Sequence, residues 1–116
     1  MFRGVSHINM DPKGRLAMPA KHRDRLMESC SGQLVATIET QNRCLLLYPL
    51  HIWEEIEQKI QSLPAFNPKV RNFQRLMIGY ASDIELDSSG RLLLPPSLRE
   101  YAELKKEAVL VGQVNL

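Results

Sequence analysis

The sequence predicts an α+β, strand-rich fold in which one supersecondary unit occurs twice, related by a pseudo-twofold axis. Residues 8–19 and 84–95 share one pattern, and the offset between matching positions is constant. In each copy, apolar and polar residues alternate on both sides of a Gly-containing turn, which is typical of a β-hairpin. Short segments with helical spacing of apolar residues flank the copies. Two copies are too few for a solenoid, so the repeat predicts internal symmetry within one fold.

The two copies agree at every position that a hairpin with a tight turn needs. Apolar residues that differ, such as Met10 and Met18 against Leu86 and Leu94, keep their apolar character. The identical pairs are Ile8 and Ile84, Asp11 and Asp87, Gly14 and Gly90, Arg15 and Arg91, Leu16 and Leu92, and Pro19 and Pro95. The same offset continues downstream, where it pairs Arg23 with Arg99, Leu34 with Leu110 and Val35 with Val111.

Each hairpin turn begins with Asp and ends with Gly. In Asp11-Pro12-Lys13-Gly14 the carboxylate can accept hydrogen bonds from the backbone ahead of it, and Pro12 presets φ. Gly14 and its counterpart Gly90 are expected at positive φ, where a Cβ is poorly tolerated. The second turn, 87–90, follows the same pattern without the Pro. The turn itself does not require the Arg that follows each Gly.

The remaining elements follow in chain order. Pro19 and Pro95 are expected to end the hairpin strands and to begin short helices, because Pro cannot donate to a strand ladder and suits a first helical turn. The segment 50–63 has one apolar face that includes Trp53, which we expect in the core. Outside the first hairpin, the predicted elements are helices 20–27, 50–63, 68–78 and 97–104 and strands 33–39, 43–48 and 80–86.

These elements divide the chain into a first repeat, 1–63, a helical linker, 64–76, and a second repeat, 77–116. Leu116 aligns with Thr40, so the second repeat lacks a counterpart of residues 43–63. Either the natural chain continues or the second repeat is shorter by nature. We expect it to continue, because a half-built repeat leaves an unpaired strand edge.

Bulk composition indicates a soluble globular chain. It is 44% hydrophobic and 24% charged, which is ordinary for such proteins. No apolar run approaches the roughly 20 residues of a membrane span, and no signal-peptide pattern opens the chain. Cys30 and Cys44 form no CxxC motif, so reduced thiols are expected, with a metal site or a disulfide as weaker alternatives.

The distribution of charge is more informative than the net charge of +2. Residues 1–25 carry six Lys or Arg against two Asp, whereas residues 28–63 carry five Glu against two basic residues. A basic hairpin followed by a basic helix is an electrostatic footprint for phosphate groups. A solvated charged surface explains charge alone equally well.

The Asp-x-x-Gly-Arg hairpin, followed by Pro and a short helix, resembles the DNA-binding hairpin of the SpoVT/AbrB superfamily of bacterial regulators. Two such copies in one chain that opens Met-Phe-Arg-Gly resemble the MraZ family, as does the stretch Lys-Glu-Ala-Val-Leu-Val-Gly at 106–112. The resemblance covers the whole chain. It implies a β-barrel made from the swapped hairpins of the two repeats.

The resemblance also implies a function. Family members are ring-shaped homo-oligomers that bind short operator repeats in duplex DNA upstream of their own operon and regulate the bacterial division and cell-wall gene cluster. It therefore implies a cytoplasmic, nucleoid-associated transcriptional regulator, with repression as the expected effect. No cofactor, membrane or small-molecule substrate is expected. The motif residues carried over by position are Asp11, Arg15, Asp87 and Arg91. Ser89 stands where the first turn has Lys13, which puts equal participation of the two hairpins in doubt.

Each candidate site residue has a structural alternative. Arg15 and Arg91 could contact phosphate or a guanine edge, which suits a planar and permanently charged group, or pair with the Asp four residues earlier. Both roles can hold together, because an Asp that orients an Arg preorganises it. Candidate contacts to the DNA backbone are Lys13, Arg3, Lys21, Arg23 and Arg25. Arg23, which recurs as Arg99, has a second candidate role as a brace between its helix and the barrel.

Two other classes of function are weaker. An oligomeric protein-interaction scaffold with incidental DNA binding is the main alternative, and strong salt dependence of duplex binding would argue against it. An enzyme is disfavoured, because the sequence has no paired carboxylates, phosphate loop or activated nucleophile. His7, His22 and His51 lack metal-ligand spacing.

Overall fold

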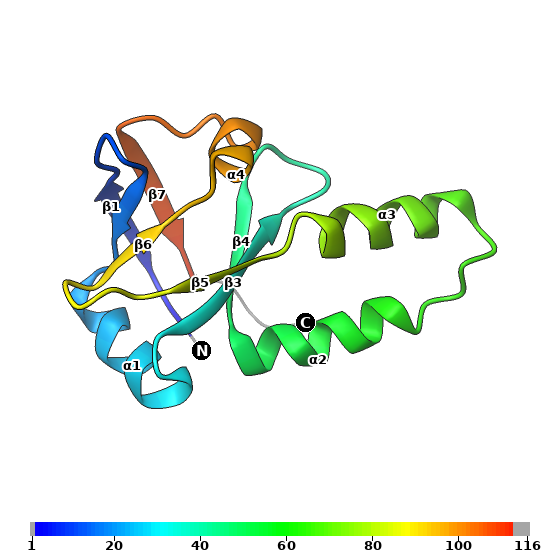
Figure 1. Cartoon of the computed structure of the whole chain (residues 1–116), viewed down its shortest axis with the longest axis horizontal. Helices are drawn as coiled ribbons and strands as arrows, with labels where there is room; N and C mark the ends of the chain where they lie inside the picture. The colour runs from blue at the N-terminus through cyan, green and yellow to red at the C-terminus, as the bar shows by residue number, and fades with distance from the viewer. Residues whose placement is uncertain (1, 113–116) are drawn as a thin grey trace.

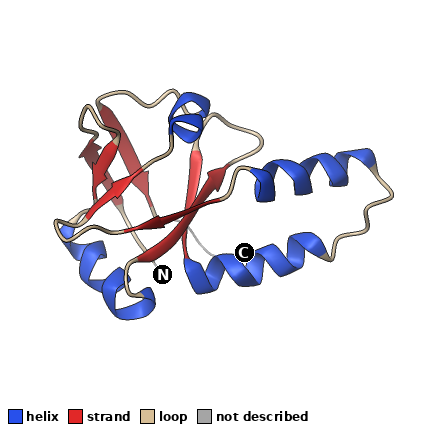
Figure 2. Ribbon diagram, viewed as in Figure 1, coloured by secondary structure: helices blue, strands red, loops and turns tan. Residues whose placement is uncertain are grey.

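A computed structural model describes residues 2–112, so the expected end of the second repeat at Leu116 lies outside the described residues. The chain is α+β and strand-rich, with short helices (Figures 1 and 2). Its elements in chain order are β1 (Val5–Asn9), β2 (Arg15–Ala17), α1 (Ala20–Cys30), β3 (Gln33–Ile38), β4 (Leu45–Pro49), α2 (Leu50–Gln61), α3 (Pro68–Gly79), β5 (Ser82–Glu85), β6 (Arg91–Leu93), α4 (Pro96–Tyr101) and β7 (Glu107–Val111).

The strands of residues 2–112 form three antiparallel sheets, and the pairings join the two repeats. Strand β1 pairs with β7, β2 pairs with β6, and β3 lies between β4 and β5. Because β5 is the counterpart of β1, the first strand of each hairpin pairs with the strand that follows the helix of the other repeat. This corrects the predicted pairing within each hairpin, because among residues 2–112 the two strands on either side of a turn form no ladder with each other. They are joined at the turn, where the Asp11 N–H donates to the Arg15 carbonyl in the first copy and the Asp87 N–H donates to the Arg91 carbonyl in the second.

Strand β3 is the centre of the fold because both of its faces are covered. Leu34, Ala36 and Ile38 belong to the main core, which both hairpins and α4 complete. Val35, on the other face, packs with Trp53, Ile60 and Met77 under the two long helices. A strand buried on both faces reads as a nearly continuous apolar run. The one polar interruption, Thr37, is satisfied by donating from Oγ1 to the Met77 carbonyl at 2.7 Å.

Helices α2 and α3 project from the strands as an antiparallel pair (Figure 1). They lengthen the molecule to 44 Å against 29 and 22 Å in the other directions. Trp53 is buried at the base of this pair, as predicted. The Asn67 side chain caps α3 by accepting from the Lys69 N–H at 2.8 Å. Among the described residues, no helix combines the length and apolar character that a membrane span requires.

The structure corrects the repeat offset beyond the hairpins. Leu34 pairs with Ile84, but Ile8 pairs with Ala108, so the structural counterpart of Leu34 is Ala108 and not Leu110. The reason is that the connection from the hairpin to β7 is shorter than the equivalent connection to β3. It is shorter because α4 ends at Tyr101, before the predicted 104, and Glu103 then turns at a φ of 56°.

Other predicted bounds differ by a few residues. Helix α1 continues to Cys30 beyond the predicted 27, and Ser31 ends it in a left-handed conformation. Strand β4 begins at Leu45, slightly later than the predicted 43. The residues before it form a loop in which the Glu39 N–H donates to the Cys44 carbonyl at 3.0 Å. The Tyr101 hydroxyl donates to the Glu39 carbonyl at 2.7 Å, which ties the loop to α4.

Candidate nucleic-acid interface

The two motif arginines come together on one face of the β2–β6 ribbon. Leu16 pairs with Leu92 at its centre, and both side chains are buried in the core. Because side chains alternate along a strand, Arg15 and Arg91 lie on the opposite, outward face. Arg15 pairs with Leu93 and Arg91 with Ala17, so the two arginines are diagonal neighbours, about 7–8 Å apart at Cα by ordinary sheet geometry.

Each arginine is held by the aspartate of its own turn. Nε of Arg15 donates to Oδ2 of Asp11 at 2.6 Å, and Nε of Arg91 donates to Oδ2 of Asp87 at 3.2 Å. The other carboxylate oxygen accepts backbone N–H groups, from Lys13 and Arg15 in the first turn and from Ser89 and Arg91 in the second. One carboxylate therefore closes the turn and orients the guanidinium, whose terminal nitrogens have no hydrogen-bond partner within residues 2–112.

These hydrogen bonds lower the pKa of both carboxyl groups. The backbone N–H of Arg15 is the largest cause for Asp11, and the backbone N–H of Arg91 is the largest cause for Asp87. Further hydrogen bonds and the charge of the same arginine also lower each pKa, and desolvation opposes them. Both aspartates are consequently ionised at neutral pH and hold the arginine in one orientation.

The turn glycines have the positive φ that the sequence predicted, 89° at Gly14 and 74° at Gly90. They are also buried, which the sequence did not indicate. A side chain from the helix of the other repeat lies against each one. A Cβ on Gly14 would lie 2.6 Å from Cζ of Arg99, and a Cβ on Gly90 would overlap with Arg23.

The structure separates the other predicted cations. Lys13 is exposed at the tip of the first hairpin. Arg3 precedes β1 and Lys21 is the second residue of α1, so both lie at the open end of the same hairpin. The Nζ of Lys21 lies near Gly4, where a Cβ would be 3.1 Å from it. Of these candidates, Arg15 and Arg91 are the pair that a single two-stranded ribbon places side by side.

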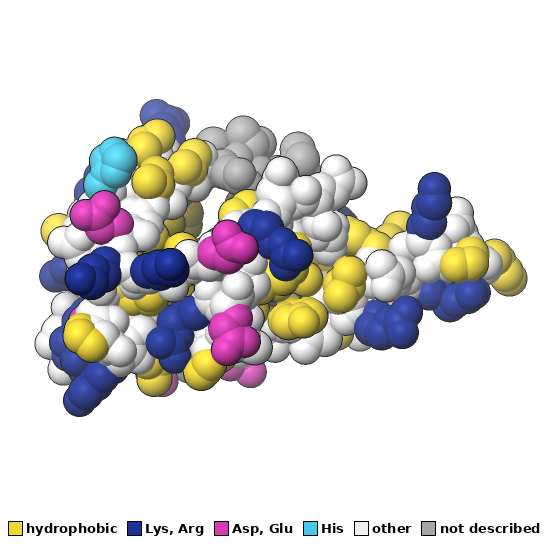
Figure 3. All heavy atoms as spheres, turned by 90° about the horizontal axis from the view of Figure 1, so that it is seen from above, with side chains coloured by type: hydrophobic (Ala, Val, Ile, Leu, Met, Phe, Trp, Pro, Cys, Tyr) yellow, Lys and Arg dark blue, Asp and Glu magenta, His cyan; other side chains and the backbone are white. Residues whose placement is uncertain are grey.

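The described part of the molecule carries two sets of cations. Figure 3 shows Lys and Arg side chains gathered at the end that holds the hairpins and α1, with a second set on the projecting helices. The second set includes Lys69, Arg71 and Arg75 of α3, which are all exposed. Arg25 of α1, which belongs to the first set, lies over the Phe2 ring with Cζ 5.8 Å from the centroid.

Alternation along β2 and β6 identifies two residues of this face that the motif missed. Ala17 and Leu93 share the outward face with the arginines, and Leu93 is 57% exposed. The signal was present in the sequence, because each stands two positions after its arginine. Together the four side chains make a small surface with two planar cations and two apolar groups.

Within the described part of the chain, no three His, Cys, Asp or Glu side chains form a group that could hold a metal ion. His22 is buried and its ring lies edge-on to Phe2, with centroids 5.3 Å apart. Burial lowers the pKa of His22, and the charges of Lys21 and Arg25 lower it further. This histidine therefore packs as a neutral group.

Comparison with known proteins gives consistent matches. The family described as "MraZ protein, putative antitoxin-like" matches residues 1–76 and 77–116, in two segments that follow the internal repeat. "Transcriptional regulator MraZ" of Alkalilimnicola ehrlichii is 56% identical over 99% of this chain and 77% of its own length. The proteins of the same name from Halorhodospira halophila and Pseudomonas aeruginosa are each 55% identical, over 99% of this chain and 76% of their own lengths. The family match over both segments and the identity to these relatives each show that the chain belongs to the MraZ family.

Proposed function

We propose that the protein is a sequence-specific, DNA-binding transcriptional regulator that recognises duplex DNA with the outward face of the β2–β6 ribbon. One observation carries the proposal: two arginines from different repeats lie side by side on an exposed two-stranded ribbon. The major groove of B-DNA admits such a ribbon, and arginine can bind O6 and N7 of guanine with two hydrogen bonds. Ala17 and Leu93 are positioned to contact thymine methyl groups beside them.

The ion pairs favour base recognition over simple charge attraction. An aspartate neutralises each arginine but engages Nε, which leaves the terminal nitrogens for a planar acceptor pair. Attraction to phosphates then depends on the other cations. Lys13 at the exposed tip, with Arg3 and Lys21 at the open end of the first hairpin, supplies this part of the binding.

Family membership supports the proposed regulatory role, and the small footprint of one chain supports the proposed oligomer. The relatives at 56% and 55% identity carry the name transcriptional regulator. We propose repression of the bacterial division and cell-wall gene cluster from short repeats upstream of the protein's own operon, with the protein located at the nucleoid in the cytoplasm. One ribbon with two arginines is a small footprint, and a ring-shaped homo-oligomer on repeated elements gains from effective concentration.

We also propose that the two repeats close into one barrel with exchanged hairpins. The pairings of β1 with β7, of β2 with β6 and of β3 with β5 each join strands from different repeats, which supports this arrangement. The barrel would hold Leu16 and Leu92 inside and both arginines outside.

The test measures binding of the full-length protein to DNA from upstream of its own gene, by fluorescence anisotropy across a salt series. Arg15→Ala should weaken binding by about 1–3 kcal/mol and relax sequence preference. Lys59→Ala, which removes an exposed cation from the far end of α2, is the matched control and should bind normally. Unchanged affinity and specificity in a folded Arg15→Ala, Arg91→Ala double variant would refute the assignment.

An oligomeric interaction scaffold is the second candidate, and an apolar groove favours it. The groove has a volume of about 490 Å³ and lies between β4, α1 and the end of β7. Val109 and Val111 on β7 are more than half exposed. If this groove is the principal functional surface, duplex binding should be weak and nonspecific, and Arg15→Ala should leave the activity in cells intact.

A further inference from the structure

We propose that Arg23 and Arg99 are positioning residues that act across the repeat boundary. Each fixes the hairpin tip of the other repeat and thereby aims the arginine that follows the tip glycine. Arg99 in the second repeat positions Arg15 in the first, and Arg23 in the first repeat positions Arg91 in the second. The functional half of this inference rests on the DNA-binding role proposed above.

The first line of support is the packing of each guanidinium on a glycine. Cζ, Nη1 and Nε of Arg99 would all lie within 2.7 Å of a Cβ on Gly14. Nε, Cδ and Cζ of Arg23 would overlap in the same way with a Cβ on Gly90. The planar group thus occupies the space that any side chain at the tip would need. The same contact occurs in both directions, so it is a feature of the architecture and not of one loop.

The second line of support is a pair of hydrogen bonds beside each tip, one between two backbone groups and one donated by the arginine side chain. The Leu94 N–H donates to the Gly14 carbonyl at 3.0 Å, and the Leu94 carbonyl accepts from Nε of Arg99 at 3.1 Å. In the mirror arrangement, the Met18 N–H donates to the Gly90 carbonyl at 3.0 Å, and the Met18 carbonyl accepts from Nη2 of Arg23 at 3.0 Å. The arginine therefore ties the tip to the strand end beside it.

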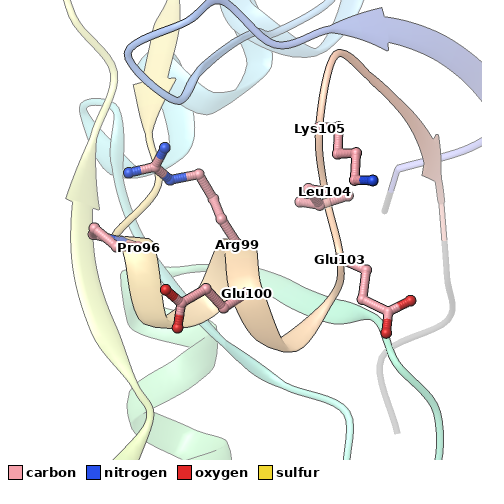
Figure 4. Close-up of a pocket in the computed structure, with 6 residues that line it drawn as sticks. All are labelled: Pro96, Arg99, Glu100, Glu103, Leu104 and Lys105. Atoms are coloured by element: carbon pink, nitrogen blue, oxygen red, sulfur yellow. The ribbon is translucent and has the colours of Figure 1, made fainter.

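The third line of support is the burial of these arginines against backbone groups. Both are half-buried, and each donates to a backbone carbonyl in the contacts described above. Nε of Arg23 is fully buried and has no hydrogen-bond partner within residues 2–112. A surface cation kept only for charge would keep its nitrogens in water. Figure 4 shows the Arg99 guanidinium pointing away from Glu103 of the same repeat.

The arrangement makes a crossed prediction that ordinary stability does not make. Gly14 immediately precedes Arg15, so freeing this tip should misplace Arg15 first. Removal of the Arg99 side chain should therefore loosen the tip of the first repeat, although Arg99 belongs to the second repeat. In the same Arg99 variant, Arg91 on the outward face of β6 should keep its geometry, because Arg23 still packs on Gly90 at the tip of the second repeat.

The experiment compares Arg99→Ala and Arg23→Ala in the full-length protein, first without DNA. Amide hydrogen exchange should become at least tenfold faster at Gly14 and Arg15 in Arg99→Ala, and at Gly90 and Arg91 in Arg23→Ala. Arg99→Lys keeps the charge but not the planar group, so it should not restore slow exchange. Faster exchange at both tips in either variant, or at the tip of the same repeat, would overturn the crossed assignment.

The second readout is a pair of double-mutant cycles on DNA binding. Arg99→Ala should weaken binding about tenfold and add little to Arg15→Ala, but should be additive with Arg91→Ala. The slope of log affinity against log salt should stay unchanged, because a positioning residue neutralises no phosphate. A slope reduced by about one unit would make Arg99 a phosphate contact and overturn the proposal. If wild-type protein does not bind DNA while the crossed exchange pattern appears, the proposed function fails and the positioning role of the arginines stands.

Discussion

Replacing Gly14 by Ala should destabilise the fold strongly for so small a change. The φ of 89° places the residue in the left-handed region, where a Cβ costs about 1–2 kcal/mol. The new Cβ would also lie 2.6 Å from the Arg99 guanidinium, so that side chain must leave. Its hydrogen bond to the Leu94 carbonyl is then lost, which costs about 1 kcal/mol. Together these effects predict a loss of about 2–3 kcal/mol.

Gly79→Ala is the matched control for this substitution. Gly79 ends α3, has no atom within 4 Å of a built Cβ and does not have a positive φ. Alanine is favoured over glycine in a helix by roughly 0.5–1 kcal/mol, so this variant should be as stable as wild type or slightly more stable. The two variants differ from wild type by the same methyl group, which isolates the effect of position.

Thermal unfolding followed by circular dichroism measures the difference. For a chain of this length a loss of about 2–3 kcal/mol should lower Tm by about 8–12 °C. Urea unfolding should show a lower midpoint with an unchanged m-value. Removing the Arg99 side chain first should relieve the steric part, so the Gly14→Ala, Arg99→Ala double variant should lose less than the sum of the single losses. Equal stability of Gly14→Ala and Gly79→Ala would refute the account of the tip.

Three further predictions concern charge, pH and packing. Lys13→Ser should weaken binding to all duplexes alike and should reduce the slope of log affinity against log salt by about one unit. If the second tip also faces DNA, Ser89→Lys should strengthen binding and increase this slope, and salt titrations of both variants measure the two slopes. Burial lowers the pKa of His22 in the fold, so the unfolded chain binds more protons than the folded chain once pH falls below about 6.5. Urea unfolding at several pH values should therefore show a free energy of unfolding that declines below this pH, and His22→Gln should reduce this decline. Leu98 on α4 is 0% exposed, so Leu98→Ala should lower the free energy of unfolding by about 2–5 kcal/mol, whereas the exposed Leu93→Ala should cost far less in the same denaturation assay.

Local patterns predicted most elements because the residues that specify them are close in sequence. The Asp and Gly of each turn, the Pro before each of α1 and α4, and the helical spacing around Trp53 all act over a few residues. Some wrong bounds come from local backbone conformation, as at Ser31 after α1 and Glu103 after α4, and others involve distant contacts. The loop before β4 is one example, because the Tyr101 hydroxyl donates to the Glu39 carbonyl from far along the chain, and no local signal marks this contact.

In the candidate site, too, the features set by residues close in sequence were predicted, and those set by contacts between distant segments were not. The repeat and the family resemblance predicted Asp11, Arg15, Asp87 and Arg91 as motif residues, and a salt bridge between the Asp and the Arg of each turn was an alternative that the structure contains. The sequence did not indicate that Arg15 and Arg91 would be diagonal neighbours, because β2 and β6 meet from opposite halves of the chain. The sequence showed that Arg23 and Arg99 occupy equivalent positions in the two repeats. It did not show that each arginine covers a glycine of the other repeat.

Sequence information alone was enough to show that one hairpin-and-helix unit is used twice, where its turns lie, and which family the chain resembles. These properties depend on residue identity at short range, where backbone preference and side-chain hydrogen bonds act. The way in which the two units combine became visible only in the folded chain. The pairing of β1 with β7 and of β3 with β5, the shortening of the second connection, and the burial of each tip under an arginine of the other repeat come from packing between segments far apart in sequence. Such contacts depend on the shape and the buried apolar area of the assembled core, and these are properties of the whole fold that no single segment has.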